Sequence, residues 1–306
     1  MSAPASPRTP SPADERRGLG LGLLGVLIFA LTLPMTRLAV GPLEAPQLSP
    51  LFVTAGRAAG AALLSLAYLA LTAAPWPTRR DLVPLAVSAL GTVAGFPLCT
   101  ALALREVPAM HAAVITGVLP LFTAAVAAWH LRQRPSAGFW ACAVLGAGLV
   151  IGFAAVQGGG HLVAADGLLL LAMGCAAAGY VAGAGLSARW RAEHVISWVL
   201  VISLPATLPL AWLGRPAEPA AVGAAAWAGF AYVTVFSMWL GFFAWYRGLA
   251  LGGMVRVSQV QMVQPFLALL LAVPVLGEPL GATTLGFAAA VVAVVFAGKR
   301  MPVRPR

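Results

Sequence analysis

Long apolar stretches alternate with short polar ones along almost the whole chain. A helix needs about 20 residues to cross about 30 Å of hydrocarbon, and on that measure the pattern predicts ten membrane-spanning helices. We expect them at residues 18–40, 50–71, 82–104, 110–131, 137–156, 167–186, 195–213, 224–249, 254–276 and 280–298. The predicted fold class is therefore an all-α membrane protein.

An internal duplication relates the two halves of the chain. A shift of 145 positions aligns Pro120 with Pro265 and His111 with Arg256. A period this long divides a chain into halves rather than into solenoid repeats. Because each half holds five spans, an odd number, we expect the second half to lie inverted in the bilayer relative to the first.

The same pattern predicts the domain boundaries. Residues 18–156 form the first five-helix repeat, residues 157–166 a glycine-rich linker, and residues 167–298 the second repeat. Residues 1–17 are rich in Pro, Ser and Ala and cannot bury a core, so we expect a disordered tail. The first apolar run is too long for a signal peptide and is interpreted as an uncleaved span. Residues 299–306 form a basic tail.

Pro120 and Pro265 each interrupt an expected span, the fourth and the ninth. A proline removes one hydrogen bond from a helix, and an unpaired backbone group in lipid is tolerated only against protein or a wet cavity. A single proline in a membrane helix commonly just bends it. The matched pair, one in each half, instead indicates the binding site of a transporter.

Composition and charge exclude a soluble protein and indicate the topology. The 306 residues are 60% hydrophobic and 9% charged, with a mean hydropathy of +0.91. The net charge is +10, but the basic residues lie between spans rather than in one patch, so we expect no nucleic-acid partner. With the N-terminus in the cytoplasm, thirteen basic residues fall on the inner side and three on the outer side, as the positive-inside rule requires. We expect both termini in the cytoplasm, in an inner or plasma membrane.

Charged and amide side chains within the spans are candidate substrate-binding groups. Arg57 lies about two turns into the second span, where a charge is expensive and usually faces the bundle interior. It either contacts an anion or ties helices together. Arg256 lies one turn into the ninth span, where snorkelling to the surface competes with a binding role. Gln259 and Gln264 follow in the same span, and such amides either orient a ligand or join helices.

Three more residues complete the candidate site. His111 opens the fourth span and can gain and lose a proton near neutral pH, so it is a candidate proton relay, or simply a hydrogen-bonded histidine. Trp239 and Tyr180 offer flat walls to a cavity. We find no metal-ligand spacing, P-loop or nucleophile motif, and therefore expect no catalytic residues and no cofactor.

Several motifs give the chain a resemblance to a known family. They are Ala101-Leu102-Ala103-Leu104, Leu119-Pro120-Leu121-Phe122, Gln264-Pro265-Phe266 and Leu276-Gly277-Glu278-Pro279. With these motifs the chain resembles the EamA-type transporters of the drug/metabolite transporter superfamily, over about residues 18–298. The resemblance implies ten helices in two inverted five-helix repeats, and an arginine in the second helix, here Arg57. The chain departs from the family where Leu131-Arg132-Gln133-Arg134-Pro135 replaces the usual Leu-Gly-Glu-Arg-Pro.

The expected function is secondary transport of a small metabolite by alternating access. An interior with Arg57 and no deep carboxylate favours a cargo carrying a carboxylate, such as an amino acid, and the resemblance implies export. Proton coupling through His111 is an open possibility, and the pattern does not define an oligomeric state. The alternatives are a broad exporter of apolar compounds, a membrane-embedded enzyme or a channel.

Overall fold

Helices make up almost all of the regular structure in the part of the chain that the computed structural model describes, namely residues 12–130, 134–157, 159, 161–187, 189–252, 260, 263–301 and 303–304. The elements of the first half are α1 (Pro12–Ala30), α2 (Thr32–Val40), α3 (Pro50–Leu71), α4 (Arg79–Ser88), the π-helix η1 (Ala89–Gly95), α5 (Phe96–Glu106), α6 (Ala109–Thr116), α7 (Leu119–His130), the short strand β1 (Arg134–Pro135) and α8 (Ala137–Gln157). The elements of the second half are α9 (Ala164–Ser187), α10 (Ala192–Gly214), the short 3-10 helix η2 (Pro219–Ala221), α11 (Ala224–Tyr232), the π-helix η3 (Val233–Leu240), α12 (Gly241–Gly252), α14 (Gln264–Leu276), α15 (Ala282–Lys299) and the short strand β2 (Val303–Arg304).

Eight helical segments among the described residues are long and apolar enough to cross a membrane. They correspond to the first eight predicted spans. Two shorter apolar helices, Gln264–Leu276 and Ala282–Gly298, lie where the ninth and tenth spans are predicted. The predicted start of the ninth span falls outside the described residues. The chain is an all-helical membrane protein, and its division into ten crossings remains a prediction.

Four of the described helices begin at least three residues before their predicted starts: α1, α4, α9 (residue 164 rather than 167) and α10 (residue 192 rather than 195). Helix α1 begins at Pro12, so the last six residues of the predicted disordered tail are helical. A proline suits the first turn of a helix, where its missing N–H is not needed, and Asp14 and Glu15 in that turn interact favourably with the helix dipole. Helix α4 begins at Arg79 rather than at the predicted residue 82. There the Asp81 carboxylate accepts hydrogen bonds from the backbone N–H and the hydroxyl of Thr78.

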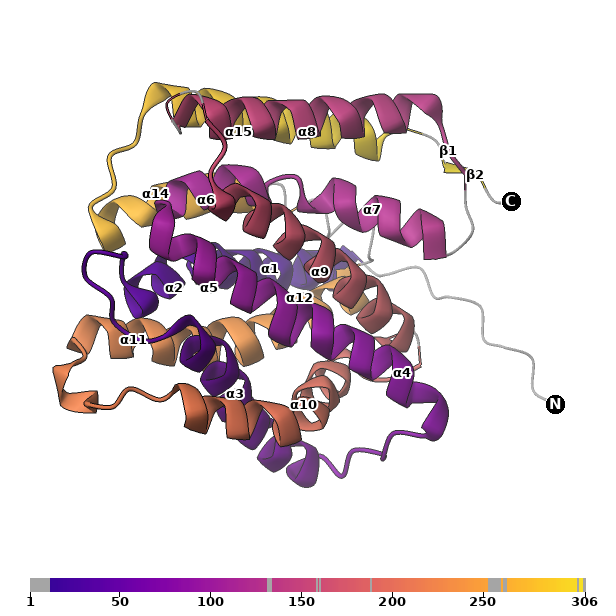
Figure 1. Ribbon diagram of the computed structural model, residues 1–306. Helices are drawn as coiled ribbons and strands as arrows, with labels where there is room; N and C mark the ends of the chain where they lie inside the picture. The colour runs from indigo at the N-terminus through magenta and orange to yellow at the C-terminus, as the bar shows by residue number, and fades with distance from the viewer. Residues whose placement is uncertain are drawn as a thin grey trace.

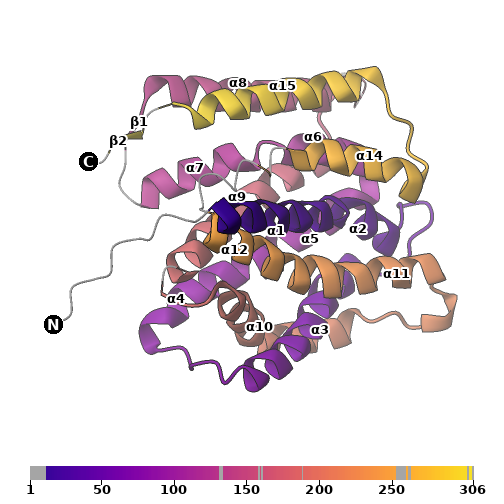
Figure 2. The same ribbon diagram turned by 180° about the vertical axis from the view of Figure 1, so that it is seen from behind.

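The helices run roughly along one common direction, and helices from the two halves lie against each other (Figure 1). Helix α8 packs beside α15, α3 beside α10, and α1 beside α12. Figure 2 shows the same pairs from behind and places the start of α1 and the end of α15 at the same end of the bundle. Because each of these pairs joins one half to the other, the two halves form one structure.

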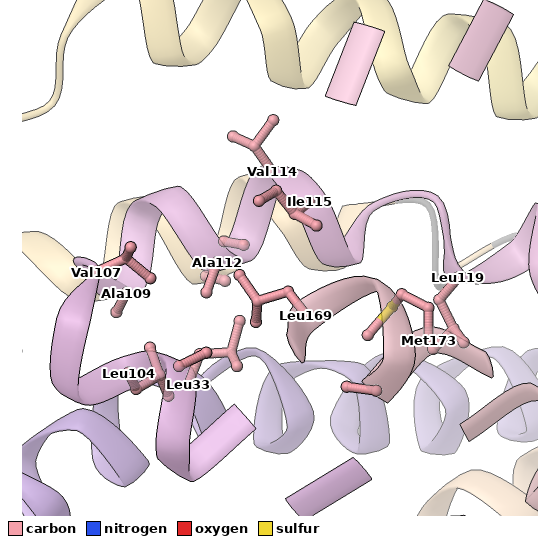
Figure 3. Close-up of a cluster of buried hydrophobic side chains, with 14 of the residues drawn as sticks. Leu33, Leu104, Val107, Ala109, Ala112, Val114, Ile115, Leu119, Leu169 and Met173 are labelled. Atoms are coloured by element: carbon pink, nitrogen blue, oxygen red, sulfur yellow. The ribbon is translucent and has the colours of Figure 1, made fainter. Parts of the chain in front are cut away.

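The larger apolar cluster of the core contains side chains from both halves. Figure 3 shows part of it: Leu169 and Met173 of α9 lie below α6 in this view, Ile115 lies on α6 above Leu169, and Val114 points away from them to the other side of α6. These four side chains are fully or almost fully buried and belong to one large cluster. Burying an aliphatic side chain of this size stabilises a fold by about 1.5–3 kcal/mol in water, although between membrane helices close packing and interhelical hydrogen bonds replace that driving force. The cluster therefore depends on tight contact between helices.

Glycines provide the closest contacts. A Cβ added to Gly91 in η1 would lie 2.3 Å from the carbonyl oxygen of Cys175 in α9, and one added to Gly248 in α12 would lie 2.7 Å from the backbone N of Gly22 in α1. At both places only a residue without a side chain allows the backbones to approach this closely. By contrast, no atom lies within 4 Å of a Cβ added to Gly148 in α8.

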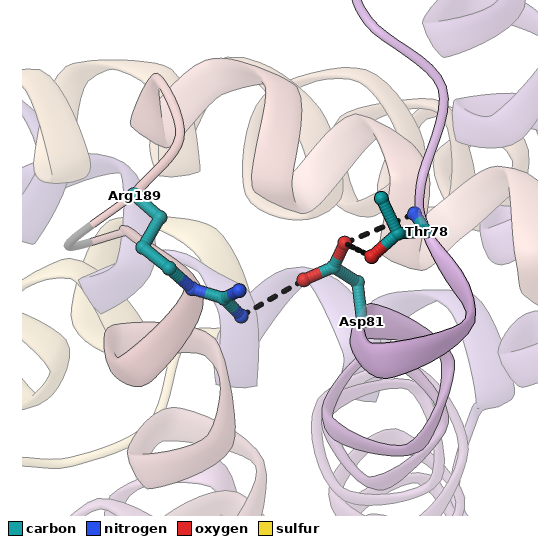
Figure 4. Close-up of polar contacts among 3 residues, drawn as sticks. All are labelled: Thr78, Asp81 and Arg189. Atoms are coloured by element: carbon teal, nitrogen blue, oxygen red, sulfur yellow. Dashed lines mark hydrogen bonds and ion pairs between the residues drawn. The ribbon is translucent and has the colours of Figure 1, made fainter.

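Connections predicted to lie on one side of the membrane contact each other. On the predicted outer side, the Gln47 side chain accepts a hydrogen bond from the backbone N–H of Gly223. On the predicted inner side, Arg189 Nη2 donates to Asp81 Oδ1 at 2.8 Å, which Figure 4 shows together with the Thr78 contact. Strands β1 and β2 pair antiparallel and join the connection before α8 to the end of the chain. These contacts agree with a chain that reverses direction at each connection.

Candidate functional site

A cavity lies in the centre of the bundle, between the two halves. About 70 Å³ of it is accessible to water, which is enough to hold ordered water. Its walls come from α1, α2, α3, η1, α5, α6, α7, α9, η3, α12, α14 and α15. The lining residues are Phe29, Thr32, Leu33, Arg57, Thr92, Phe96, Thr116, Gly117, Leu119, Pro120, Ala176, Tyr180, Ser237, Met238, Phe242, Gln264, Pro265, Ala268, Val292 and Val295.

Arg57 supplies the charge in this cavity. Its side chain is 3% exposed, so it does not snorkel to a surface. Arg57 Nη2 donates a hydrogen bond of 3.1 Å to Ser237 Oγ, and Ser237 Oγ shares one of 2.8 Å with Thr32 Oγ1. Within the described ranges Arg57 has no carboxylate partner, and its Nε has no hydrogen-bond partner at all. The bond to Ser237 ties α3 to η3, which is one of the two predicted roles of Arg57, and contact with an anion stays a prediction.

Glycines beside Arg57 allow this arrangement. A Cβ added to Gly60 would lie 2.8 Å from Thr234 Cγ2, and one added to Gly56 would lie 3.0 Å from Phe230 Cζ. Small residues at a helix interface let the backbones approach. The close approach of α3 to α11 and η3 brings the guanidinium within hydrogen-bond distance of Ser237.

The structure places a helix start at each of the two predicted breaks, and Pro120 and Pro265 both line the cavity. Helix α7 begins at Leu119 and α14 at Gln264, positions that are 145 residues apart. Pro120 and Pro265 each occupy the second position of the new helix, where a proline costs no hydrogen bond. The interruption between α6 and α7 therefore lies just before Pro120, whereas most of the segment before Pro265 lies outside the described residues. A Cβ added to Gly117, at the end of α6, would lie 3.4 Å from Pro265 Cγ, so the first interruption lies beside the start of α14.

The structure also places two π-helices at matching positions of the duplication, which sequence reasoning missed. η1 covers Ala89–Gly95 and η3 covers Val233–Leu240. Each brings a hydroxyl to the cavity, Thr92 from η1 and Ser237 from η3. π-Helical segments are rare and are often found at functional sites. The signal was present in the sequence, because Thr92 and Ser237 are separated by the same 145 residues as the prolines.

The remaining candidate binding residues differ in whether they line the central cavity. Gln264 and Tyr180 line the cavity, as predicted. Trp239 does not, and that prediction is wrong for this cavity. Ser237 faces the cavity, and a residue two positions further along a helix points to nearly the opposite side. The Trp239 ring instead contacts Tyr68 and Phe243. Arg256 and Gln259 lie outside the described residues.

His111 lies away from the central cavity, at the predicted outer end. Its Nε2 and Asp166 Oδ1 are 2.6 Å apart, and both side chains are buried. Asp166 Oδ2 also accepts a hydrogen bond from the backbone N–H of Val163. A second, wider pocket (≈ 730 Å³) is lined by His111 together with Glu44, Arg105, Glu106 and Glu278. Sequence analysis did not identify Asp166 as the partner of His111, because the two residues come together only when α6 and α9 pack.

Glu278 connects the two halves at the same end. Its carboxylate oxygens accept hydrogen bonds from the backbone N–H groups of Ala109, at 2.7 Å, and Met110, at 2.8 Å. These are the first two residues of α6. Free N–H groups at a helix start attract a negative charge, so the acidic residue of the terminal Leu276-Gly277-Glu278-Pro279 motif holds the start of α6.

Comparisons with known proteins agree with this architecture. A solved crystal structure superposes with a TM-score of 0.60 over 94% of this chain and 97% of the other, at 17% sequence identity, which supports the fold alone. A protein of Bacillus subtilis (strain 168) named uncharacterized transporter YdeK is 44% identical over 279 residues, which are 91% of this chain and 96% of that protein. The EamA-like transporter family matches residues 16–154 and again residues 163–297. The chain therefore belongs to the EamA-like transporter family, and its place is in a membrane.

Proposed function

We propose that this protein is a secondary transporter that exports a small metabolite carrying a carboxylate, such as an amino acid, by alternating access. The observation that carries the proposal is Arg57, a buried guanidinium at the central cavity with no carboxylate partner among the described residues. Membership of a transporter family supplies the general activity. The cavity supplies the chemistry of the cargo.

A buried charge without a counter-ion is costly, by several kcal/mol even after the protein relaxes. A substrate carboxylate at Arg57 would offset that cost. Arginine also suits the role because its planar fork of N–H groups matches the two oxygens of a carboxylate. An organic cation would face repulsion from Arg57 and find no acidic residue lining the cavity.

The helix breaks supply a basis for alternating access. The cavity lies where α6 ends and α7 and α14 begin, so each half contributes a helix start to it. Breaks of this kind in corresponding helices of inverted repeats let one half rock against the other around a fixed site. The matching π-helices and the contacts between alternate connections support the inverted arrangement.

Coupling to protons is part of the proposal, and it is assigned to His111 and Asp166. The pair is buried, joins α6 of the first half to α9 of the second, and lies beside the outer pocket. A proton bound there would change the charge at a contact between the halves. Such a site can bias one orientation of the transporter without touching the substrate.

A broad exporter of apolar compounds is the second candidate function. The cavity walls favour it, since they include several large apolar side chains, among them Phe29, Phe96, Met238 and Phe242. The two functions differ in their dependence on Arg57, because an apolar cargo does not need a guanidinium.

Counterflow in proteoliposomes tests the proposal. Proteoliposomes that contain the wild-type protein and are loaded with an unlabelled amino-acid mixture are expected to accumulate labelled amino acid with saturable kinetics. Arg57→Gln should lower the apparent affinity at least tenfold. Arg57→Lys should retain part of the affinity, because lysine keeps the positive charge but lacks the planar pair of N–H groups that matches a carboxylate. The matched control is Arg247→Gln, which removes an exposed arginine of α12. Equal activity of wild type and Arg57→Gln would refute the carboxylate site, and conductance without saturation would identify a channel.

A further inference from the structure

The polar side chains of the central cavity differ in whether their hydrogen bonds are already made. Thr32 and Ser237 bond to each other, and Ser237 also accepts from Arg57 Nη2. The Thr92 hydroxyl donates to the carbonyl oxygen of Ser88, and the Thr116 hydroxyl to that of Ala113. All four hydroxyls are therefore occupied by contacts within the protein.

Two buried polar atoms of the lining residues have no partner in the part of the chain that the structure describes. They are Arg57 Nε and Gln264 Oε1. A buried polar atom left without a hydrogen bond costs about 1–3 kcal/mol, so most such atoms in native proteins are paired. The two atoms have opposite character, since Arg57 Nε–H is a donor and Gln264 Oε1 is an acceptor.

A ligand that satisfied both atoms would present an acceptor to Arg57 and a donor to Gln264. An anion alone would leave Gln264 unpaired. An amide or hydroxyl alone would leave the charge of Arg57 without a counter-ion. The remaining walls are apolar and aromatic, which suits a hydrocarbon body between or beside the two polar ends.

The two halves are not equivalent at this point. The position 145 residues before Gln264 is Leu119, which also lines the cavity and also begins a helix after a break. Of these two matching helix starts, the one in the second half therefore offers an acceptor and the one in the first half an apolar surface.

We propose that Gln264 determines specificity by accepting a hydrogen bond from an N–H or O–H group of the substrate whose carboxylate contacts Arg57. The substrate class is then a carboxylate with an apolar body and a second, donor-bearing group, and a simple carboxylate is discriminated against. This inference rests on the proposed function, because it assumes that the central cavity binds the cargo.

Binding of three matched ligands to the purified full-length protein in detergent tests the inference. L-leucine, its 2-hydroxy analogue and 4-methylpentanoate share one apolar body and one carboxylate, and the last has no donor group beyond it. Isothermal titration avoids the passive leak of weak acids across liposomes. The wild type is expected to bind the two donor-bearing compounds at least tenfold more tightly than 4-methylpentanoate.

Gln264→Met should remove this preference, because it replaces the amide by a side chain of similar length without a strong acceptor. Affinity for the donor-bearing compounds should fall at least tenfold while that for 4-methylpentanoate stays within twofold. The matched control is Gln157→Leu, since that glutamine bonds to Thr284 near the outer pocket. If Gln264→Met does not elute as a folded monodisperse protein, Gln264→Leu takes its place, with Leu119→Gln to test whether an amide on the opposite wall alters the preference.

The outcomes separate this inference from the proposed function. If Gln264→Met lowers the affinity for all three ligands equally, or for none of them, Gln264 does not accept a hydrogen bond from the substrate and the inference is overturned. A loss of affinity in Arg57→Gln would in that case still support the carboxylate site. If the wild type binds none of the three, or binds them independently of Arg57, the proposed function fails first and takes the inference with it.

Discussion

Loss of the Glu278 carboxylate should open the outer end of the protein. Glu278 follows α14 in the second half and holds the first two N–H groups of α6 in the first half, at 2.7 and 2.8 Å. Any movement that separates these halves at the outer end has to break both hydrogen bonds. Glu278→Gln keeps one acceptor oxygen at the same place but removes the charge and the second acceptor.

The expected size of the effect follows from those contacts. A hydrogen bond to a charged group contributes about 1.5–3 kcal/mol, and the attraction of a carboxylate to a helix start contributes about 0.3–1 kcal/mol at an exposed site. The glutamine retains one neutral hydrogen bond of about 0.5–1.5 kcal/mol, so the lower end of these ranges gives a net loss of about 2 kcal/mol. That corresponds to about a thirtyfold shift toward the state that is open at the outer end.

Labelling of a single thiol in the cavity measures this shift. Thr116→Cys places the thiol among the lining residues, in a background in which Cys99, Cys142 and Cys175 are replaced by alanine. A membrane-impermeant maleimide added to intact cells should then react about thirtyfold faster in Glu278→Gln than in its parent. The control is Glu218→Gln, an exposed carboxylate between α10 and α11. The reasoning is refuted if Glu278→Gln labels at the parental rate, or if Glu218→Gln accelerates labelling as much.

Three further predictions concern packing, coupling and topology. Gly91→Ala should lower the melting temperature and the yield of folded protein, because its Cβ would lie 2.3 Å from a backbone oxygen of α9 and overpacking costs about 1–3 kcal/mol. The control is Gly148→Ala, whose Cβ would have no neighbouring atom within 4 Å and which should melt at the wild-type temperature. Equal melting temperatures of the two variants would contradict this prediction. In proteoliposomes, His111→Gln and Asp166→Asn should abolish uptake driven by a pH gradient while counterflow persists, whereas retained pH-driven uptake would exclude the pair as the coupling site. Single thiols at Arg132 and Glu218 should be labelled from opposite sides of the membrane, and labelling of both from one side would disprove the predicted topology.

The class of protein, the positions of most helices and the helix starts beside Pro120 and Pro265 could be predicted from the sequence. These features follow from local patterns. Apolar runs of membrane length are readable because lipid requires every backbone group to bond within its own helix. A proline changes its own helix wherever the tertiary contacts lie. The 145-residue duplication places Pro120 and Pro265 at equivalent positions of the two halves. Arg57 was readable for the same reason, since a charge in an apolar run is conspicuous.

Contacts between polar side chains that are distant in the sequence could be found only in the tertiary structure. Arg57 and Ser237 are 180 positions apart in the chain, and their contact depends on glycines that let α3 approach η3. Trp239 was assigned to the cavity from its residue type, but the orientation of η3 turns it away. The structure also separated His111 from the central cavity and gave it Asp166 as a partner, because that contact arises from the packing of α6 against α9. Local patterns record which side chains are polar, whereas the angle and depth at which helices pack determine whether two of them share a cavity.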